Sequence, residues 1–157
     1  MRFSPELAVF AAAAIFACIL KSYSQAGYFI APGDWAILKD KVGIYEKSDN
    51  IWIPGYRDAA AALNGSFKFI SGIPGTSPDK NYIMVNRKLF RVQFAGLLKD
   101  GRKMIFCNFF DRRMNAGQWK TEQVITEDTD FSSWSLLFDM ATGACSDFTI
   151  NGRRGIR

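Results

Sequence analysis

The sequence predicts a single α+β domain in which one main helix packs on an antiparallel meander sheet of four to six strands, cystatin-like in architecture. Three observations support this prediction. An alanine-rich segment near residue 60 has the composition of a helix, an Asp-Gly pair separates two long apolar runs, and the residues after 133 alternate between apolar and polar. The chain has 157 residues, 48% of them apolar, which is enough for one packed core.

The N-terminal segment is typical of an export signal. The apolar run Leu7–Leu20 follows Arg2 and precedes a polar stretch that ends in Ser24-Gln25-Ala26, whose small residues fit cleavage before Gly27. The run is shorter than the roughly 20 residues that a membrane-spanning helix needs. A retained membrane anchor is therefore the weaker alternative.

We accordingly expect residues 1–26 to be a signal peptide and residues 27–157 to form one α+β domain that is periplasmic or secreted. A lipoprotein site with Cys18 acylated stays open as a second interpretation. Membrane association is expected only if the N-terminal segment is retained or Cys18 is acylated.

The first half of the domain predicts a helix, a strand and a loop. Pro54–Leu63 is the expected main helix, because consecutive alanines favour helix and Asn64-Gly65 is a good stop signal. Ser66–Ser71 alternates two phenylalanines with polar residues and predicts a strand. The Gly-, Pro- and Ser-rich stretch Gly72–Asp79 predicts a loop.

The second half predicts a hairpin. Tyr82–Leu98 and Lys103–Phe110 are apolar and flank Asp100-Gly101, the strongest hairpin signal in the chain. A two-residue loop at this position sets the register, so that Val92 lies opposite Phe109. Both faces of this hairpin are apolar.

Three further strands are expected after the hairpin. Trp119–Glu127 has a weak strand pattern. Ser133–Met140 alternates cleanly and predicts a half-buried antiparallel strand, and Cys145–Asn151 follows after a turn of about three residues. In this alternation Cys107 and Cys145 fall on opposite faces of the sheet, which argues against a disulfide between them.

Charge is segregated along the chain, whose net charge is +5. Residues 80–121 hold ten basic and two acidic side chains, and residues 122–148 hold six acidic and no basic ones. Strands from the two blocks can pair their charges across the sheet, and a functional charged patch is the alternative. A nucleic-acid binder is usually more uniformly basic, so we expect no nucleic acid as partner.

The absence of histidine removes the usual general base and the commonest metal ligand. The sequence also contains no Gly-rich phosphate loop, Cys-x-x-Cys motif or nucleophile elbow. We therefore expect no catalytic residue, no cofactor and no metal site, and the protein is predicted not to be an enzyme. An uncharacterised hydrolase is kept as the last alternative.

One face of the hairpin is the candidate binding surface. If the sheet has a helix on one side only, the other face would present an aromatic and basic patch, a composition found at protein interfaces. Its residues are Arg91, Leu97, Met104, Phe106, Phe110, Arg112 and Arg113. The alternative is that the N-terminal block, with Tyr28, Phe29 and Trp35, folds across this face and covers it.

A second candidate is a pocket between helix and sheet that would take a small apolar ligand. Its lining would come from Tyr56, Trp134 and Phe138. Apolar and aromatic side chains are the usual lining of such sites.

Four short motifs follow one another in the C-terminal half: Asn108-Phe109-Phe110, Trp119-Lys120, Phe138-Asp139, and Asp147-Phe148 to Asn151-Gly152. In these motifs the chain resembles a group of small exported bacterial proteins of unassigned function. The resemblance implies an exported α+β fold and no catalytic residue. Members of the group often carry cysteines where this chain has Asp111 and Ser133, so the resemblance implies no disulfide here.

Together these observations predict an exported binding protein of the inhibitor or immunity type, acting through protein–protein contact. The expected partner is another protein or a second copy of the chain. The small-ligand binder and the hydrolase are the two alternatives.

Overall fold

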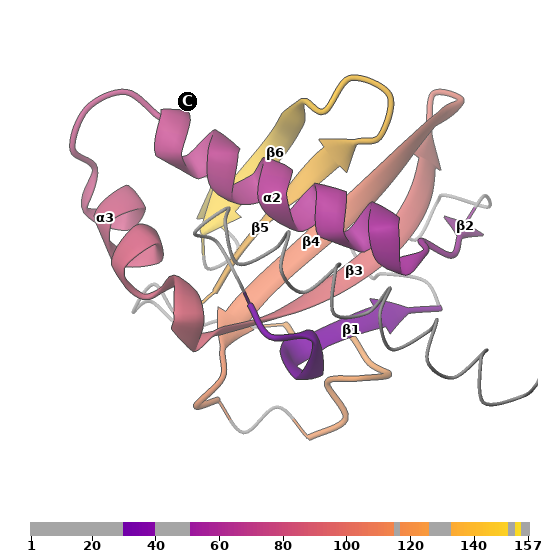
Figure 1. Cartoon of the computed structure of the whole chain (residues 1–157), viewed down its shortest axis with the longest axis horizontal. Coiled ribbons are helices and arrows are strands. Elements are labelled where there is room, and N and C mark those ends of the chain that lie inside the picture. The colour runs from indigo at the N-terminus through magenta and orange to yellow at the C-terminus, as the bar shows by residue number, and fades with distance from the viewer. Residues whose placement is uncertain (1–29, 40–50, 115–116, 126–132, 151–152, 155–157) are drawn as a thin grey trace, which may run out of the picture.

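The computed structural model describes residues 30–39, 51–114, 117–125, 133–150 and 153–154. In this part of the chain a long helix, α2 (Tyr56–Gly72), lies across one face of a twisted sheet, and a shorter helix, α3 (Pro78–Val85), follows it (Figure 1). The predicted α+β class is confirmed. The expected signal peptide lies outside the described residues, and none of the helices within them has the length and apolar composition needed to cross a membrane.

The sheet is mixed rather than wholly antiparallel. Its strands run in the order β1-β3-β4-β5-β6-β7, and β2 also pairs with β3. Their bounds are β1 Trp35–Leu38, β2 Ile51–Trp52, β3 Phe90–Lys99, β4 Arg102–Asp111, β5 Ser133–Asp139, β6 Cys145–Ile150 and β7 Arg153–Arg154. β1 is parallel to β3, while the other pairs are antiparallel. The expectation of an antiparallel sheet is therefore wrong at the β1 edge, where the connection through α2 and α3 is long enough for a parallel pair.

The hairpin of β3 and β4 forms as predicted. The pairing extends from Phe90 opposite Asp111 to Lys99 opposite Arg102, and it includes the expected pair Val92 and Phe109. The two turn residues have positive φ, 52° at Asp100 and 74° at Gly101. Such φ values suit the two-residue turns whose twist matches that of the flanking strands.

The helix α2 runs past its expected stop signal. Asn64-Gly65 lies inside it, and Ser66–Ser71 is helical rather than a strand. The reason is packing: Leu63, Phe67 and Ile70 share one buried face at helical spacing. The helical spacing of these buried residues outweighs the alternation of Phe67 and Phe69 with polar residues, which by itself indicates a strand.

The helix α3 is not predicted by the sequence pattern, and the strand expected from Tyr82 begins only at Phe90. Pro78 is the first residue of α3, a favourable position for proline, and the Ser77 hydroxyl accepts a hydrogen bond of 3.5 Å from the Lys80 amide. The loop expected at Gly72–Asp79 is therefore shorter than predicted, because Gly72 is the last residue of α2 and α3 begins at Pro78.

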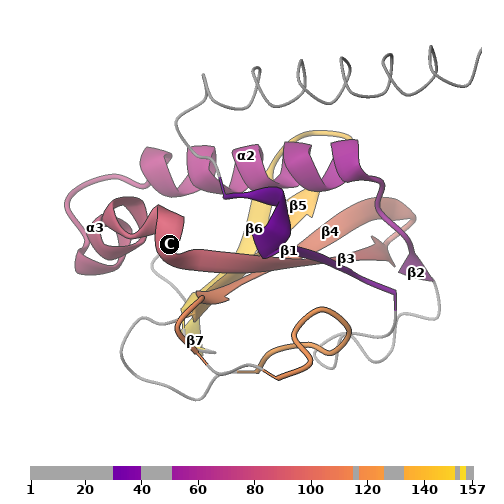
Figure 2. The same ribbon diagram turned by 60° about the horizontal axis from the view of Figure 1, so that its bottom comes forward.

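The strand β5 is buried on both faces, so the expectation of a half-buried strand is wrong. Trp134, Leu136 and Phe138 face α2, and all seven residues from Ser133 to Asp139 are buried. On the face opposite α2, Leu137 of β5 packs in a cluster with Leu97, Met104 and Phe106. Figure 2 shows α2 above the sheet and a loop segment below it. That segment includes residues 117–125, which are not a strand as expected; residues 126 and 127 lie outside the described part.

The facing of Cys145 is also corrected. The register between β5 and β6 shifts between Ser135 and Leu137, and Asp147 has a φ of 52°. Such an irregularity reverses the facing of the residues on one side of it, so Cys145 pairs with Phe138 and packs against the same core as Cys107. Both thiols are free. They lie two strands apart in the sheet, roughly 10 Å at the usual strand spacing, which is beyond disulfide reach.

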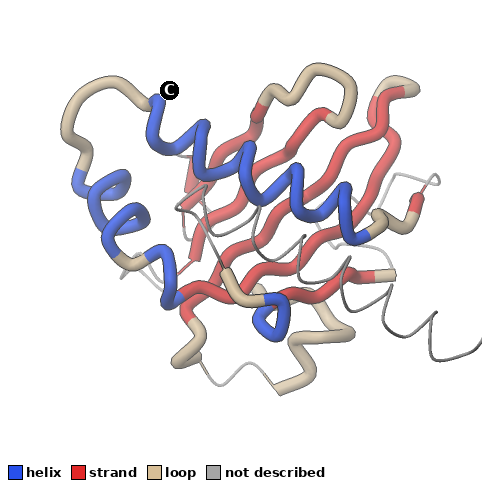
Figure 3. The backbone as a smooth tube through the Cα atoms, viewed as in Figure 1, coloured by secondary structure: helices blue, strands red, loops and turns tan. Residues whose placement is uncertain are grey.

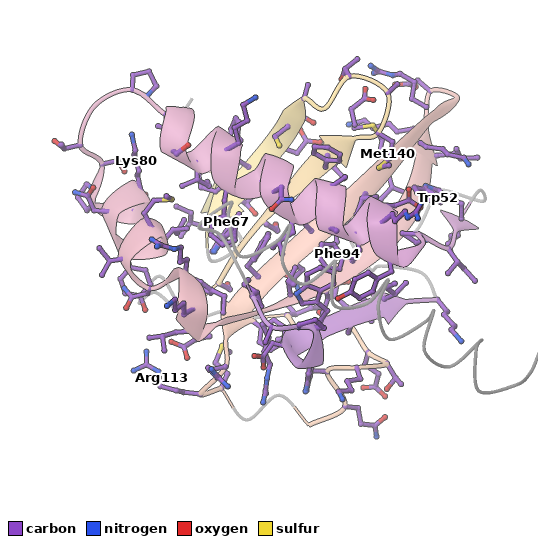
Figure 4. All side chains as sticks on the ribbon, in the orientation of Figure 1. Trp52, Phe67, Lys80, Phe94, Arg113 and Met140 are labelled. Atoms are coloured by element: carbon purple, nitrogen blue, oxygen red, sulfur yellow. The ribbon has the colours of Figure 1, made fainter. Side chains whose placement is uncertain are left out.

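The main core lies between α2 and the sheet and is dominated by aromatic rings. The Trp134 ring stacks on Phe109 with centroids 3.6 Å apart, and Phe67 meets both of these rings edge-on. Figure 4 places Phe67 and Phe94 in this layer. The tube in Figure 3 shows the same two-layer arrangement without side chains.

Candidate functional site

The apolar half of the predicted binding patch is core rather than surface. Leu97, Met104, Phe106 and Phe110 are all buried, with Phe106 only 2% exposed. The prediction of an exposed aromatic face is therefore wrong. These residues belong to two small clusters on the side of the sheet opposite α2.

Part of the cover is the segment 117–125. Trp119 meets the Phe110 ring edge-on, with centroids 5.9 Å apart, and Val124 packs beside it. Trp35, which the alternative expected on this face, lies instead in the main core and stacks on Tyr56 at 4.8 Å. The other two residues of that alternative, Tyr28 and Phe29, lie outside the described residues.

A buried amide pair ties this covering segment to the sheet. Gln93 and Asn108 lie directly opposite each other on β3 and β4. The Gln93 amide donates to the carbonyls of Trp119 and Glu122 at 2.5 and 2.6 Å, and its oxygen accepts from the Val124 amide at 2.9 Å.

The Asn108 amide completes the network. It donates to the Gln93 oxygen at 2.9 Å and to the Val124 carbonyl at 2.8 Å. We call Gln93 and Asn108, with their hydrogen bonds to the covering segment, the amide clamp. The sequence contained a signal for it, because the predicted hairpin register places the two amides opposite each other on an otherwise apolar face. Buried amides in such a position need partners, and the covering segment supplies them.

The expected ligand pocket is filled by protein side chains. Trp134 is 1% exposed, and its ring is contacted by Phe67, Phe90, Phe109 and Phe148. Phe138 is buried against Gly65, and Tyr56 lies at the start of α2 against Trp35. The three residues are thus part of the packing between helix and sheet.

The basic half of the predicted patch does come together at the surface. Arg91 lies near the start of β3, and Arg112 follows the end of β4, where its amide donates to the Leu89 carbonyl at 2.7 Å. The hairpin register therefore brings the two arginines to the same end of the hairpin. We call the group of Arg91, Arg112, Arg113, Trp119 and Lys120 the arginine end.

Two of these arginines share one carboxylate. Asp34, in the short 3-10 helix η1 (Pro32–Asp34), has Arg91 Nε 3.5 Å from its Oδ1 and Arg112 Nη2 3.7 Å from its Oδ2. Both distances are those of ion pairs and are longer than good hydrogen bonds. Arg91 also lies over the Trp119 ring, with its Cζ 4.9 Å from the ring centroid, so a cation–π contact orients it.

Arg113 is held by a different carboxylate. Its Nε donates to Asp111 at 2.9 and 3.1 Å, its Nη2 donates to the same carboxylate, and its backbone amide donates to Asp111 Oδ1 at 2.8 Å. These hydrogen bonds lower the pKa of Asp111, against the effect of its burial. The Arg113 side chain is 69% exposed and projects at the periphery of the molecule (Figure 4).

At the other end of the hairpin, near the turn, basic side chains are paired with carboxylates of the later strands. Lys99 pairs with Asp147, and Arg102 pairs with Asp139, each at 3.1 Å. The contact between Arg102 and Asp139 joins the neighbouring strands β4 and β5 and confirms the predicted pairing of the basic block with the acidic block at this position. Lys99 and Asp147 link the same two blocks, although β3 and β6 are not neighbours.

The arginine end holds an excess of positive charge. Arg112 is 47% exposed, and Lys120 is also exposed, with its Nζ 5.6 Å from the Trp119 ring centroid. Among the described residues, Arg91, Arg112, Arg113 and Lys120 carry four positive charges, and the carboxylates that form ion pairs with them are those of Asp34 and Asp111. Such a surface attracts anionic groups.

Two properties of the described residues concern reactive groups: the state of the two thiols and the grouping of metal-ligating side chains. Burial raises the pKa of the Cys145 thiol to about 11 and that of Cys107 still further, so both thiols are poor nucleophiles at neutral pH. Within the described ranges, no three His, Cys, Asp or Glu side chains are grouped so that they could hold a metal ion.

Comparison of the chain with known protein families, with curated proteins and with solved structures finds no match. The candidate site therefore rests on the geometry of the arginine end alone.

Proposed function

We propose that this chain is a small exported binding protein that acts through protein–protein contact, in the manner of an inhibitor or an immunity protein, and that the arginine end is its contact surface. The observation that carries the proposal is the fixed placement of exposed guanidinium groups beside Trp119. Asp111 holds Arg113 through several hydrogen bonds, and Asp34 and Trp119 orient Arg91.

Arginine is one of the residues enriched in binding hot spots, and here the buried ring of Trp119 contacts Arg91 and helps to orient it. An arginine whose side chain is already ordered loses less conformational entropy on binding than a free one. The excess of positive charge favours a partner with an acidic surface and would speed their encounter at low salt.

A different protein suits this surface better than a second copy of the chain. In a two-fold symmetric dimer the same patch contacts its own copy, so the arginine end would meet like charge. We accordingly favour a heterologous partner, and we propose no nucleic acid and no cofactor. As part of the same proposal we take the architecture to be cystatin-like, supported by the single long helix α2 over the antiparallel strands β3 to β6.

The small-ligand alternative is not favoured, because Trp134 and Phe138 are enclosed by other side chains. No observation in the described part of the chain favours a hydrolase. We therefore propose binding rather than catalysis.

The test compares two variants of equal net charge. Arg112→Gln with Lys120→Gln neutralises two charges of the arginine end, while Arg57→Gln with Lys68→Gln neutralises two exposed charges on α2. Arg113 is left in place, because its loss would leave the buried Asp111 carboxylate without its hydrogen-bonded cation. The full chain and both variants are used to capture partners from periplasmic extract and from extracts of neighbouring cells, with quantification by mass spectrometry.

The proposal expects one acidic protein to be captured by the wild type and the α2 variant and to be lost with the arginine-end variant. That protein is then purified, and its binding is measured directly. Equal binding by both variants would show that the arginine end is not the contact surface.

A further inference from the structure

We infer that Arg112 is a binding site for a carboxylate side chain of the partner, and that Asp34 occupies this site in the free protein. The inference rests on the proposed function and names the chemistry that its surface recognises. It assigns the ligand group as aspartate or glutamate in an acidic protein segment.

The contact between Arg112 and Asp34 is loose and partly solvated. The shortest distance between the two charged groups is 3.7 Å, and the Arg112 side chain is 47% exposed. Among the described residues this is the ion pair made by the Arg112 guanidinium; the side chain is also attracted electrostatically to Asp111, and no side-chain hydrogen bond holds it to either carboxylate. Its N–H groups are therefore open to an incoming carboxylate, for which the planar guanidinium is the best-matched side chain.

Arg91 would remain paired with Asp34 after the ion pair between Arg112 and Asp34 is broken. It approaches the other carboxylate oxygen of Asp34 at 3.5 Å, and its side chain is less exposed, at 27%. Trp119 holds Arg91 from a further direction. Release of Arg112 therefore leaves the Asp34 carboxylate, whose side chain is 16% exposed, with Arg91 as its cationic partner, while the half-exposed Arg112 exchanges one carboxylate for another.

The neighbouring arginine does not offer the same site. Arg113 already uses its Nε and Nη2 on Asp111, with contacts that include 2.9 and 3.1 Å hydrogen bonds. Breaking them would leave Asp111, a residue that is 4% exposed, without its main cation. Arg113 is therefore a fixed positive charge beside the site, and Arg112 is the side chain that exchanges.

The test uses an acetylated and amidated hexaglutamate peptide as the probe and inorganic phosphate as the second probe. Binding to the full chain is measured by titration calorimetry at low ionic strength. The variants are Asp34→Asn and Arg112→Gln, and the control is Arg102→Gln, which removes one arginine at the opposite end of the hairpin.

Asp34→Asn is expected to bind hexaglutamate about two- to fivefold more tightly than the wild type, because the internal competitor loses its charge while a hydrogen-bonding oxygen is kept. Arg112→Gln is expected to bind about tenfold more weakly, as for loss of a charge-assisted hydrogen-bonded pair. The control is expected to bind like the wild type.

The outcomes separate the inference from the proposed function. If Arg112→Gln weakens binding but Asp34→Asn binds equally or more weakly, Asp34 is a positioning residue only and the inference fails while the proposed function stands. If hexaglutamate binding does not depend on Arg112, the inference fails, and the capture experiment with the variant changed at Arg112 and Lys120 decides the proposed function separately. Phosphate binding as tight as that of hexaglutamate, with the same dependence on Arg112, would show a general anion site and overturn the assignment to a carboxylate.

A further variant keeps the test decisive if Asp34→Asn fails to fold. Arg112→Lys retains the positive charge but lacks the planar fork. It is expected to lose most of the binding lost in Arg112→Gln. Wild-type affinity in Arg112→Lys would show that charge alone attracts the probe.

Discussion

Gly65 on α2 lies against Phe138 on β5 so closely that a Cβ at this position would be 2.2 Å from Phe138 Cε2. Gly65→Ala is therefore expected to destabilise the protein by about 1 to 2 kcal/mol, because the overpacking cost exceeds the gain in helix propensity. Urea unfolding followed by circular dichroism measures the change. Gly72→Ala, at the last residue of the same helix, is the control, since a Cβ there meets nothing within 4 Å.

The amide clamp predicts a second effect. Gln93→Leu should cost about 2 to 4 kcal/mol, because it leaves backbone groups of Trp119, Glu122 and Val124 without their partner. It should also speed hydrogen exchange of the Val124 amide, which mass spectrometry or NMR can follow. Gln118→Leu, an exposed residue of the same segment, is the control and should change neither quantity. Unchanged protection of Val124 in Gln93→Leu would contradict the role given to the clamp.

The environment of Asp139 leads us to expect that its contribution to stability depends on pH. Hydrogen bonds from the Ala141 and Thr142 amides, helped by Arg102, lower the pKa of Asp139 in the folded protein. A carboxylate with a lowered pKa stabilises the fold above its unfolded pKa of about 4, and this contribution is lost as the pH falls through the lower folded pKa.

Asp139→Asn should therefore be less stable than the wild type at pH 7, and the difference should shrink as the pH approaches about 2. Thermal unfolding measured across this range tests the expectation. Asp100→Asn, in the exposed turn at the hairpin tip, is the control for loss of a carboxylate. A difference between Asp139→Asn and the wild type that stays constant with pH would rule out this role of Asp139.

Phe106 tests the assignment of the back face to the core. Phe106→Asp is expected to prevent folding, because it places a charge where the native side chain is 2% exposed. Phe106→Leu keeps the site apolar and should fold with reduced stability, by about 1 to 3 kcal/mol. Solubility and circular dichroism of the two variants separate the possibilities: a folded and stable Phe106→Asp protein would mean that this face is surface.

The hairpin of β3 and β4 could be predicted because its signals are local. Asp100-Gly101 adopts positive φ at little cost, and a two-residue turn leaves a single register for the strands that follow. The same register predicts that Gln93 opposes Asn108 and that Arg91 and Arg112 lie at one end. Part of the candidate site was thus contained in the sequence.

Three other features depended on contacts between distant segments. Asn64-Gly65 has the local character of a helix stop, yet Phe138 requires a residue without a side chain at the helix surface, and the helix continues. Cys145 changed face because an irregularity between β5 and β6 shifts the register. The parallel pairing of β1 with β3 has no local signal at all.

The sequence by itself determined the α+β class, the hairpin with its register, and the concentration of basic residues in the segment that forms β3 and β4. Tertiary structure decided which apolar face of the sheet is covered and which basic side chains outnumber the carboxylates near them. The physical reason is that turn geometry and helix propensity act over a few residues, whereas burial and charge pairing depend on neighbours far apart in the chain. Segment 117–125 buries Phe110, and Asp34 meets Arg91 and Arg112, only once the fold has formed.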